Sequence, residues 1–141
     1  MKIYFAGPWF TVEQRMVYCQ ALLQTTCKHN HDIYIPKFVK LSPLETFVSN
    51  VDNINDCDMM IALVDYKDVG TAWEIGMAYA KNKPIYLVGS TEDVFLKSKT
   101  NLMLAFTGKC ILLKDIPKLL TNSLTESDYV KIPVSNWEVI E

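Results

Sequence analysis

Arginine is almost absent from this sequence, because Arg15 is the only one among 141 residues. The guanidinium group is the common bidentate partner of phosphate, although lysine and backbone amides also bind it. A site selective for a phosphorylated substrate is therefore disfavoured. The net charge is -2 and the charges are spread along the chain, so a basic face for nucleic acid is not expected either.

Long hydrophobic runs are also missing. Half of the residues are hydrophobic, which is enough for a normal core, but no apolar run approaches the roughly 20 residues that cross a membrane. The start of the chain, Met1 to Phe5, lacks the charged segment, long apolar run and cleavage site of a signal peptide. We therefore expect a cytoplasmic protein that binds no membrane.

Cysteine and histidine are too few, and wrongly spaced, for an obvious metal site. No C-x-x-C pair occurs, so we expect buried free thiols of a reducing compartment. The H-x-H pair beside Asp32 lies in what looks like an ordinary exposed turn between a helix and a strand, so we expect no metal there. These residues are Cys19, Cys27, Cys57, Cys110, His29 and His31.

Short apolar runs alternate with segments of helical periodicity. Strands are predicted at residues 2–6, 33–35, 59–64, 84–88 and 110–113. Helices are predicted at residues 12–29, 43–56, 71–82, 101–106 and 116–124, and residues 127–141 show no clear period. Strands that are apolar throughout are typical of parallel sheets covered on both faces. We predict one α/β domain over residues 1–141, with a flavodoxin-like, doubly wound, five-stranded parallel sheet and helices on both faces.

In such sheets, ligands bind beyond the carboxyl ends of the strands. This rule brings together Ala6 to Phe10, the loop after Ile35, and the segment from Asp65 to Glu74. Glu74 is predicted near the start of a helix whose other residues are mostly apolar, and a carboxylate there is costly unless it is used or paired. Periodicity alone leaves a solvent-facing glutamate open.

The loop after the first strand, Ala6-Gly7-Pro8-Trp9-Phe10, has no dinucleotide fingerprint and is no P-loop. Gly7 allows a ligand or a helix to approach the backbone closely. Trp9 and Phe10 either stack on a flat heterocycle or pack beneath the loop. The polar run from Asn50 to Asp58 is expected to form caps and turns.

Three segments in order resemble the nucleoside 2-deoxyribosyltransferases. They are Ile-Tyr-Phe-Ala-Gly-Pro-Trp-Phe-Thr at residues 3–11, Asp-Val-Gly-Thr-Ala-Trp-Glu-Ile-Gly-Met-Ala-Tyr-Ala at 68–80, and Asn-Leu-Met at 101–103. The resemblance covers about residues 1–120. Because the segments have family-like spacing, they favour a functional Glu74 over a solvent-facing one.

The resemblance implies a role for each matched residue. Glu74 would be the nucleophile that attacks C1' of deoxyribose, and Tyr4 would hold it by a hydrogen bond. Asp68 would bind the base and help move its proton. Asn101 and Met103, from an adjacent chain, would contact the sugar hydroxyls and steady Glu74. Substrate contacts are expected for Ala6, Trp9, Phe10, Asn50, Asp52, Gly70, Asn101 and Met103.

The sequence departs from the family at two places. Many members carry a second base-binding aspartate where this chain has Asn50, with Asp52 nearby but out of register. An amide both donates and accepts hydrogen bonds but is no acid. The second departure is the region between the first helix and Asp58, which is shorter than in the long members of the family. The tail beyond Tyr129 does not align clearly, so Trp137 and Glu141 are only candidates for the site.

The expected activity is transfer of 2-deoxyribose between bases through a covalent intermediate on Glu74, with slow hydrolysis when no acceptor base is present. Neither cofactor nor metal is needed for this chemistry. The expected partners are deoxynucleosides, free bases and further copies of the chain, in a homo-oligomer built from dimers, with a hexamer as one option. The alternatives are a deoxynucleoside 5'-monophosphate N-glycosidase and a non-enzymatic nucleotide-binding module.

Overall fold

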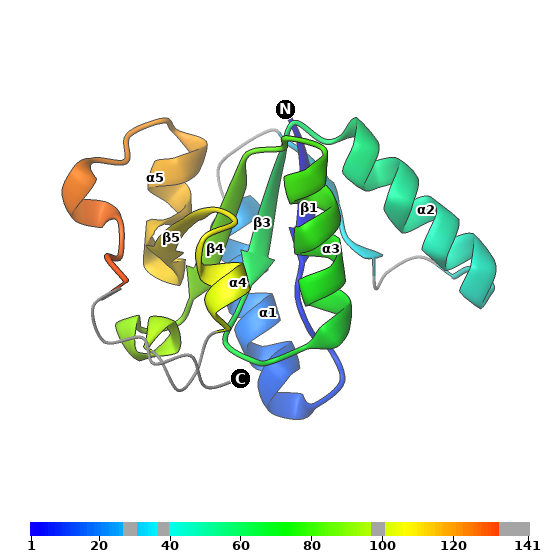
Figure 1. Ribbon diagram of the computed structural model, residues 1–141, viewed down its shortest axis with the longest axis horizontal. Coiled ribbons are helices and arrows are strands. Elements are labelled where there is room, and N and C mark those ends of the chain that lie inside the picture. Colours follow the sequence, from blue (N-terminus) through cyan, green and yellow to red (C-terminus); the bar gives the residue numbers. More distant parts are fainter. Residues whose placement is uncertain (27–30, 37–39, 97–100, 133–141) are drawn as a thin grey trace.

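The computed structural model describes residues 1–26, 31–36, 40–96 and 101–132 (Figure 1). Within these residues, five parallel strands form one sheet in the order β2-β1-β3-β4-β5. The predicted flavodoxin-like sheet is therefore confirmed, and each strand lies within one residue of its predicted bounds. The strands are β1 (Lys2–Ala6), β2 (Asp32–Tyr34), β3 (Met59–Leu63), β4 (Ile85–Gly89) and β5 (Lys109–Leu112).

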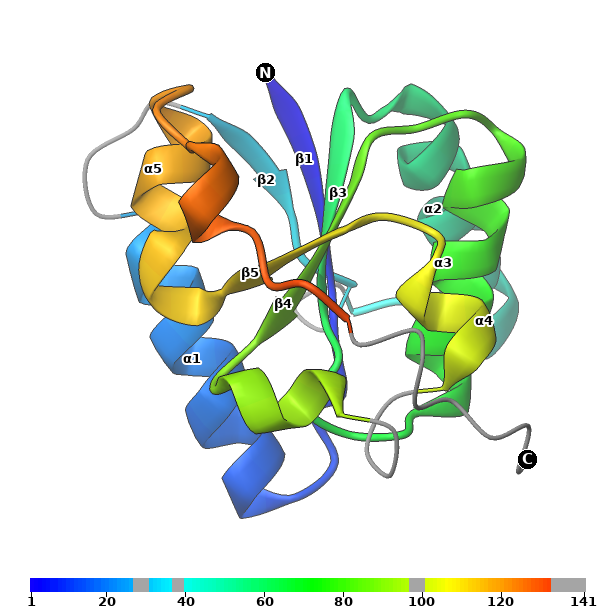
Figure 2. The same ribbon diagram turned by 60° about the vertical axis from the view of Figure 1, so that its left-hand side comes forward.

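Helices cover both faces of the sheet, as Figure 2 shows. One face carries α1 (Val12–Thr26) and α5 (Ile116–Leu120). The other carries α2 (Pro43–Asp56), α3 (Val69–Ala80) and the short α4 (Leu102–Ala105). Single 3₁₀ turns are η2 (Glu92–Phe95), η3 (Leu113–Asp115) and η4 (Glu126–Asp128).

Strand β1 divides its side chains between two hydrophobic cores, because successive residues of a strand point to opposite faces. Ile3 and Phe5 belong to the core beneath α1 and α5, together with Tyr18, Ala21 and Ile116. Tyr4 and Ala6 belong to the core beneath α2 and α3, together with Ile54, Ile75 and Ala78. All four β1 residues are almost completely buried, so β1 is held from both sides.

Side-chain caps set where the helices begin. The predicted capping box at α1 is present, since Gln14 N donates to Thr11 Oγ1 at 3.1 Å and Thr11 N donates to Gln14 Oε1 at 3.0 Å. Helix α2 begins with a second capping box between Ser42 and Glu45, followed by the predicted proline at its first position. The predicted end of α1 near His29 lies outside the described residues.

Three predicted helix bounds were wrong by two residues or more, and one of them is the end of α3, which lies at Ala80 rather than residue 82. Helix α3 begins at Val69 rather than residue 71, because Asp68 caps it two residues earlier than expected. Helix α5 ends at Leu120 rather than residue 124, because Thr121 is its C-cap and Asn122 follows with a φ of 53°, in the left-handed region that stops a helix.

Beyond α5, Val130 N donates to Cys110 O at 2.8 Å, so this part of the tail covers the edge strand β5.

The cysteine prediction was right in part. Cys57 and Cys110 are buried free thiols, and burial raises the pKa of the Cys110 thiol to about 12. Cys19 is also free but exposed, so its predicted burial was wrong; it lies on the outer side of α1. Cys27 lies outside the described residues. In the part of the chain that the structure describes, no helix is long and apolar enough to cross a membrane.

Two glycines should respond oppositely to a methyl group. A Cβ at Gly108 would lie 2.9 Å from the carbonyl carbon of Ile85, so Gly108→Ala must push β5 away from β4. We expect it to lower the free energy of unfolding by about 1–3 kcal/mol. Gly76 lies within α3 with nothing within 4 Å of its Cβ position, so Gly76→Ala should raise that free energy by about 0.5–1 kcal/mol. Urea unfolding followed by circular dichroism measures both, and equal effects would contradict this account.

Candidate active site

The centre of the site is a carboxylate buried against the sheet. Glu74 lies in the second turn of α3 and is only 9% exposed, which excludes the solvent-facing alternative. Its Oε1 accepts a hydrogen bond of 2.8 Å from the hydroxyl of Tyr4, in the middle of β1. Burial, and secondly the negative charge of Glu74, raise the pKa of Tyr4 far above its ordinary value. Tyr4 is therefore a neutral, permanent donor to the carboxylate.

The loop after β1 is fixed by α1. Tyr18 of α1 donates a 2.8 Å hydrogen bond to Phe5 O, and the ring of Trp9 packs edge-on against Tyr18 with centroids 5.0 Å apart. A Cβ at Gly7 would lie 3.1 Å from the Tyr18 ring. The residue that approaches Gly7 closely is therefore Tyr18. The same tyrosine packs against Trp9 and so fixes the ring of Trp9 at the edge of the site.

A cavity of about 330 Å³ opens beside Glu74, and we call it the Glu74 cavity. This volume is within the usual range for sites of small molecules. Aromatic side chains from the β1–α1 loop form one wall, and polar side chains from α2 and from the start of α3 form another. Its lining residues are Trp9, Phe10, Pro36, Thr46, Asn50, Asp68, Gly70, Thr71 and Glu74.

Asp68 has two roles, because one side chain both caps α3 and lines the Glu74 cavity. Its Oδ2 accepts hydrogen bonds of 2.7 Å from both the backbone N and the hydroxyl of Thr71, which is why α3 begins where it does. The same side chain lines the Glu74 cavity. Capping therefore fixes the orientation of this carboxyl group relative to Glu74, which lies six residues further along the chain.

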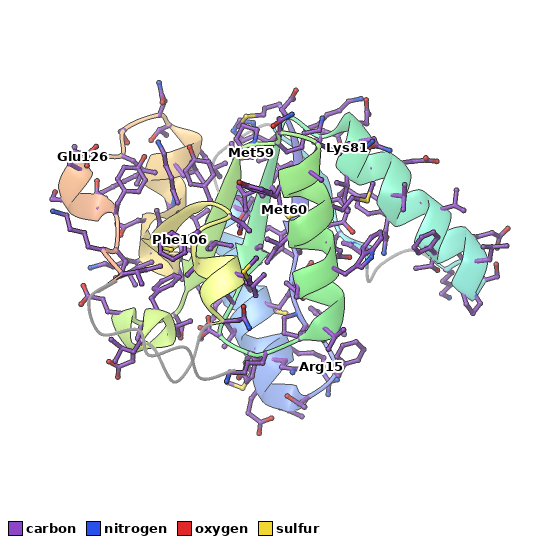
Figure 3. The ribbon with its side chains drawn as sticks, in the orientation of Figure 1. Arg15, Met59, Met60, Lys81, Phe106 and Glu126 are labelled. Atoms are coloured by element: carbon purple, nitrogen blue, oxygen red, sulfur yellow. The ribbon has the colours of Figure 1, made fainter. Side chains whose placement is uncertain are left out.

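Arg15 serves the loop rather than the cavity. Its Nη1 donates to the backbone carbonyls of Trp9 and Phe10 at 3.4 and 3.3 Å. Figure 3 shows Arg15 at the end of the molecule where α1 begins. The single guanidinium of the chain is thus used to hold the loop that carries the aromatic wall.

Asn50 is joined to the sheet through Tyr34, the last residue of β2. The Tyr34 hydroxyl lies 2.9 Å from Asn50 Oδ1 and 2.9 Å from Ser49 Oγ. Tyr34 is the register partner of Tyr4 in the neighbouring strand, and their ring centroids are 5.3 Å apart. Two adjacent tyrosines therefore each hold one polar residue of the Glu74 cavity.

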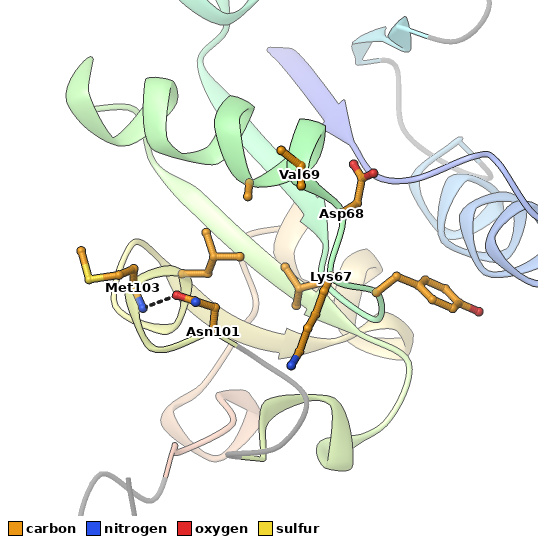
Figure 4. Close-up of a pocket in the computed structure, with 9 residues that line it drawn as sticks. Lys67, Asp68, Val69, Asn101 and Met103 are labelled. Atoms are coloured by element: carbon orange, nitrogen blue, oxygen red, sulfur yellow. Dashed lines mark hydrogen bonds between the residues drawn. The ribbon is translucent and has the colours of Figure 1, made fainter. Parts of the chain in front are cut away.

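A second cavity, of about 340 Å³, lies on the other side of Asp68, and we call it the Met103 cavity (Figure 4). Asn101 Oδ1 accepts from Met103 N at 2.8 Å, which caps α4. Met103 is 76% exposed. The residues that line the Met103 cavity are Val64, Tyr66, Lys67, Asp68, Val69, Ala72, Asn101, Met103 and Leu104. Asn101 and Met103 therefore do not line the Glu74 cavity of their own chain.

The structure brings together Glu74, Tyr4, Asp68, Trp9, Phe10, Asn50 and Gly70 among the predicted site residues. Asp52 is exposed on α2 and lines neither cavity, and Ala6 is fully buried at the end of β1. Trp137 and Glu141 lie outside the described residues. Sequence reasoning missed Tyr34 and Thr46; the spacing of Thr46 and Asn50, four residues apart on one helix, indicates a shared face.

The chemistry of the cavity is that of a carboxylate with a neutral donor. In a site shielded from water, such a group can attack an electrophilic carbon or stabilise positive charge that develops there. Among the described residues, no group of three or more His, Cys, Asp or Glu side chains could hold a metal ion.

A family model described as nucleoside 2-deoxyribosyltransferase matches residues 3–113. No curated protein sequence gives a significant match. Among solved structures, the chain is similar to a 2-deoxyribosyltransferase from the psychrotolerant bacterium Bacillus psychrosaccharolyticus, at 26% identity and a TM-score of 0.62, over 83% of this chain and 90% of that chain.

Two further structures share the fold. A 2-deoxyribosyltransferase from Leishmania mexicana has 26% identity and a TM-score of 0.54, over 64% of this chain and 65% of that chain. The CMP N-glycosidase BcmB from Clostridium botulinum has a TM-score of 0.59, over 86% of this chain and 96% of that chain. Its identity is 20%, so this last likeness is one of fold alone.

The buried tyrosine of the site should be visible in the pH dependence of stability. Because the folded state raises the pKa of Tyr4 above its ordinary 10.0, its stabilising contribution is complete below that pH and is lost as the pH rises further. The free energy of unfolding should therefore fall above pH 10, by about 1.4 kcal/mol per pH unit for Tyr4. Tyr4→Phe should remove this part of the slope in urea titrations between pH 9 and 11. Tyr79→Phe, on the exposed side of α3, is the control and should behave as the wild type; an unchanged slope in Tyr4→Phe would contradict the expectation.

Proposed function

The chain belongs to the nucleoside 2-deoxyribosyltransferase family, and we propose that it transfers the 2-deoxyribosyl group between nucleobases through a covalent intermediate on Glu74. The family and the similar structures indicate that the chain is an enzyme. They support either transfer of the deoxyribosyl group of nucleosides or a related N-glycosidase reaction, with nucleosides and nucleobases as substrates. The observation that carries the proposal is the buried pair of Glu74 and Tyr4 at the wall of the Glu74 cavity.

In the first step, a Glu74 carboxylate oxygen forms a bond to C1' while the bond from C1' to the base nitrogen breaks. The bonding electrons leave with the base, which takes up a proton with help from Asp68. As the base leaves, C1' develops positive charge, and the nearby carboxylate stabilises it. Tyr4 donates to one carboxylate oxygen and so fixes the direction in which the group faces.

In the second step, a nitrogen of another base attacks C1' and displaces Glu74, which becomes a carboxylate again, and the proton that this nitrogen loses is taken up with help from Asp68. If water attacks instead, the product is free deoxyribose, and the enzyme hydrolyses its substrate slowly. The aromatic wall of Trp9 and Phe10 supports this mechanism because flat bases pack on such rings. Gly70 leaves room at the start of α3, and Asn50 contacts the base from α2.

We further propose that a neighbouring copy of the chain completes the site. Asn101 and Met103 face the Met103 cavity rather than Glu74 of their own chain. Large apolar side chains are exposed around the site on α2, α3 and α4, as at interfaces between subunits; they are Leu44, Phe47, Val48, Val69, Trp73 and Met103. A homo-oligomer built from dimers would cover them and place Asn101 and Met103 against the partner's sugar site.

The first alternative is a deoxynucleoside 5'-monophosphate N-glycosidase, because a CMP N-glycosidase shares the fold. That activity needs a site for a phosphate group. The only arginine of the chain already donates to the carbonyls of Trp9 and Phe10, which favours unphosphorylated substrates. The second alternative is a nucleotide-binding module without activity. It does not explain why a carboxylate that is costly to bury lies at the wall of the cavity.

Glu74→Ala should abolish turnover while the fold stays intact. Incubation of deoxyinosine with adenine should give deoxyadenosine with the wild-type protein, and less than about a hundredth of that rate with the variant, because loss of a covalent nucleophile costs far more than this. Glu74→Gln, which keeps the shape and an acceptor for Tyr4, should be equally inactive. Glu92→Ala, at an exposed glutamate, is the control.

The same assay separates the alternatives. Reactions without adenine measure hydrolysis, and adenosine as donor tests the preference for 2'-deoxyribose. If deoxyadenosine monophosphate is a much better donor than deoxyadenosine, the N-glycosidase is the correct function. If no donor reacts but nucleosides bind with unchanged affinity to Glu74→Ala, the chain is a binding module.

The shared site can be tested by complementation. Glu74→Ala and Asn101→Ala should each lose most activity because each removes one part of every site. Co-expressed with different affinity tags and purified through both, they form mixed oligomers in which some sites carry both changes and others carry neither. Activity should then return to a fraction of the wild type that the mixing ratio sets. Mixed oligomers no more active than the two variants added together would show that Asn101 acts within its own chain or not at all.

A further inference from the structure

Asn50 holds a place in the Glu74 cavity where its amide can face a ligand in either of two ways. One way presents the carbonyl oxygen, which accepts hydrogen bonds, and the other presents the NH₂ group, which donates them. The hydrogen bonds behind Asn50 decide between them. The side chains that pair with Asn50 and with its neighbours on α2 therefore fix which end of the amide faces the cavity.

The network begins at Asn53, one turn further along α2. Its Nδ2 donates to the backbone carbonyl of Ser49 at 2.8 Å, and since a carbonyl can only accept, this end of Asn53 must be the NH₂ group. The same Nδ2 lies 3.4 Å from Ser49 Oγ, so the serine hydroxyl accepts there. The Tyr34 hydroxyl lies 2.9 Å from the same Ser49 Oγ, and either hydroxyl of this pair can be the donor.

Tyr34 donates its single hydroxyl proton to Asn50 Oδ1, so the Ser49 hydroxyl is the donor in the pair that it forms with Tyr34. The distance from the Tyr34 hydroxyl to Asn50 Oδ1 is 2.9 Å. With its carbonyl oxygen held by Tyr34, Asn50 turns its NH₂ group away from β2. Among the residues that the structure describes, this NH₂ group has no hydrogen-bond partner in the protein, although Asn50 lines the cavity.

We propose that Asn50 determines which bases the enzyme accepts, by donating a hydrogen bond to the exocyclic oxygen of 6-oxopurines and 4-oxopyrimidines. This inference rests on the proposed function and names its substrate class. Nucleobases differ at this position because they carry either an oxo group, which accepts, or an amino group, which donates. An amino group placed against the NH₂ of Asn50 leaves two donors facing each other, with neither satisfied.

Tyr34 is the positioning residue for this selection. It touches no part of the base but holds the carbonyl end of Asn50, and its ring lies against Tyr4, which holds Glu74. Without the Tyr34 hydroxyl, the amide could rotate and present its oxygen to an amino group. Discrimination between the two classes of base should then be lost while binding to the cavity continues.

The experiment compares bases that differ at this position: hypoxanthine with adenine, and uracil with cytosine. Calorimetry gives the Kd of each free base, and steady-state kinetics gives kcat/KM of each deoxynucleoside. The wild type should favour the oxo member of each pair by about tenfold or more, the usual effect of an unsatisfied polar group in a binding site.

Asn50→Asp replaces the donor by a carboxylate, which accepts from an amino group and repels an oxo group, so the ratio should reverse. Tyr34→Phe should bring the ratio close to one, mainly by improving the amino bases. Asn55→Asp, which adds the same charge at an exposed position of α2, should keep the wild-type ratio.

A wild-type preference for amino bases would overturn the proposal, and so would an Asn50→Asp ratio that stays within about twofold of the wild type. The Kd values decide this even if no deoxynucleoside is turned over. Absence of turnover with a normal ratio of Kd values would refute the proposed function but not the selection by Asn50. Turnover with unselective binding, unchanged by Asn50→Asp, would refute the selection alone.

Discussion

A hydrogen bond of 2.8 Å joins Tyr4 in the middle of strand β1 to Glu74 in the second turn of α3, and the arrangement of the site follows from it. A carboxylate removed from water is stable only when its charge is balanced by donors. The sheet supplies the donor and the helix supplies the carboxylate, so neither element can move without separating them. The aromatic loop after β1 and the cap of α3 are then placed on either side of a fixed group.

The neighbouring tyrosine extends this arrangement across the sheet. Tyr4 and Tyr34 are register partners on β1 and β2, and each directs a hydroxyl toward one helix, Tyr4 toward α3 and Tyr34 toward α2. Strands β1 and β2 thus orient both the residue that would react with the sugar and the residue that would contact the base. Side chains of a rigid sheet lose little freedom on binding, which suits groups that must be placed accurately.

Much of the fold was predictable because it depends on local patterns. Apolar runs gave the strands, and Thr11 with Gln14 and Ser42 with Pro43 gave two helix starts. The start of α3 was missed because an aspartate in a loop can either cap a helix or face a ligand, and Asp68 does the first while lining the cavity. The burial of Glu74 needed the family resemblance, and Tyr34 was not found at all, because pairing between β1 and β2 depends on contacts between distant parts of the chain.

Strand β1 carries its structural and functional residues on alternate positions, with Ile3 and Phe5 toward α1 and Tyr4 toward Glu74. A shift of one residue in its pairing would exchange the two faces, placing a phenyl ring beside the carboxylate and a hydroxyl in the opposite core. Both errors would be costly at once. Two constraints therefore fix the register of β1, the packing of the core and the hydrogen bond to Glu74. A molecule in which β1 pairs in the wrong register would be inactive even if it stayed compact. Insertions and deletions should be tolerated in the loops that follow the helices far more readily than anywhere in these five residues.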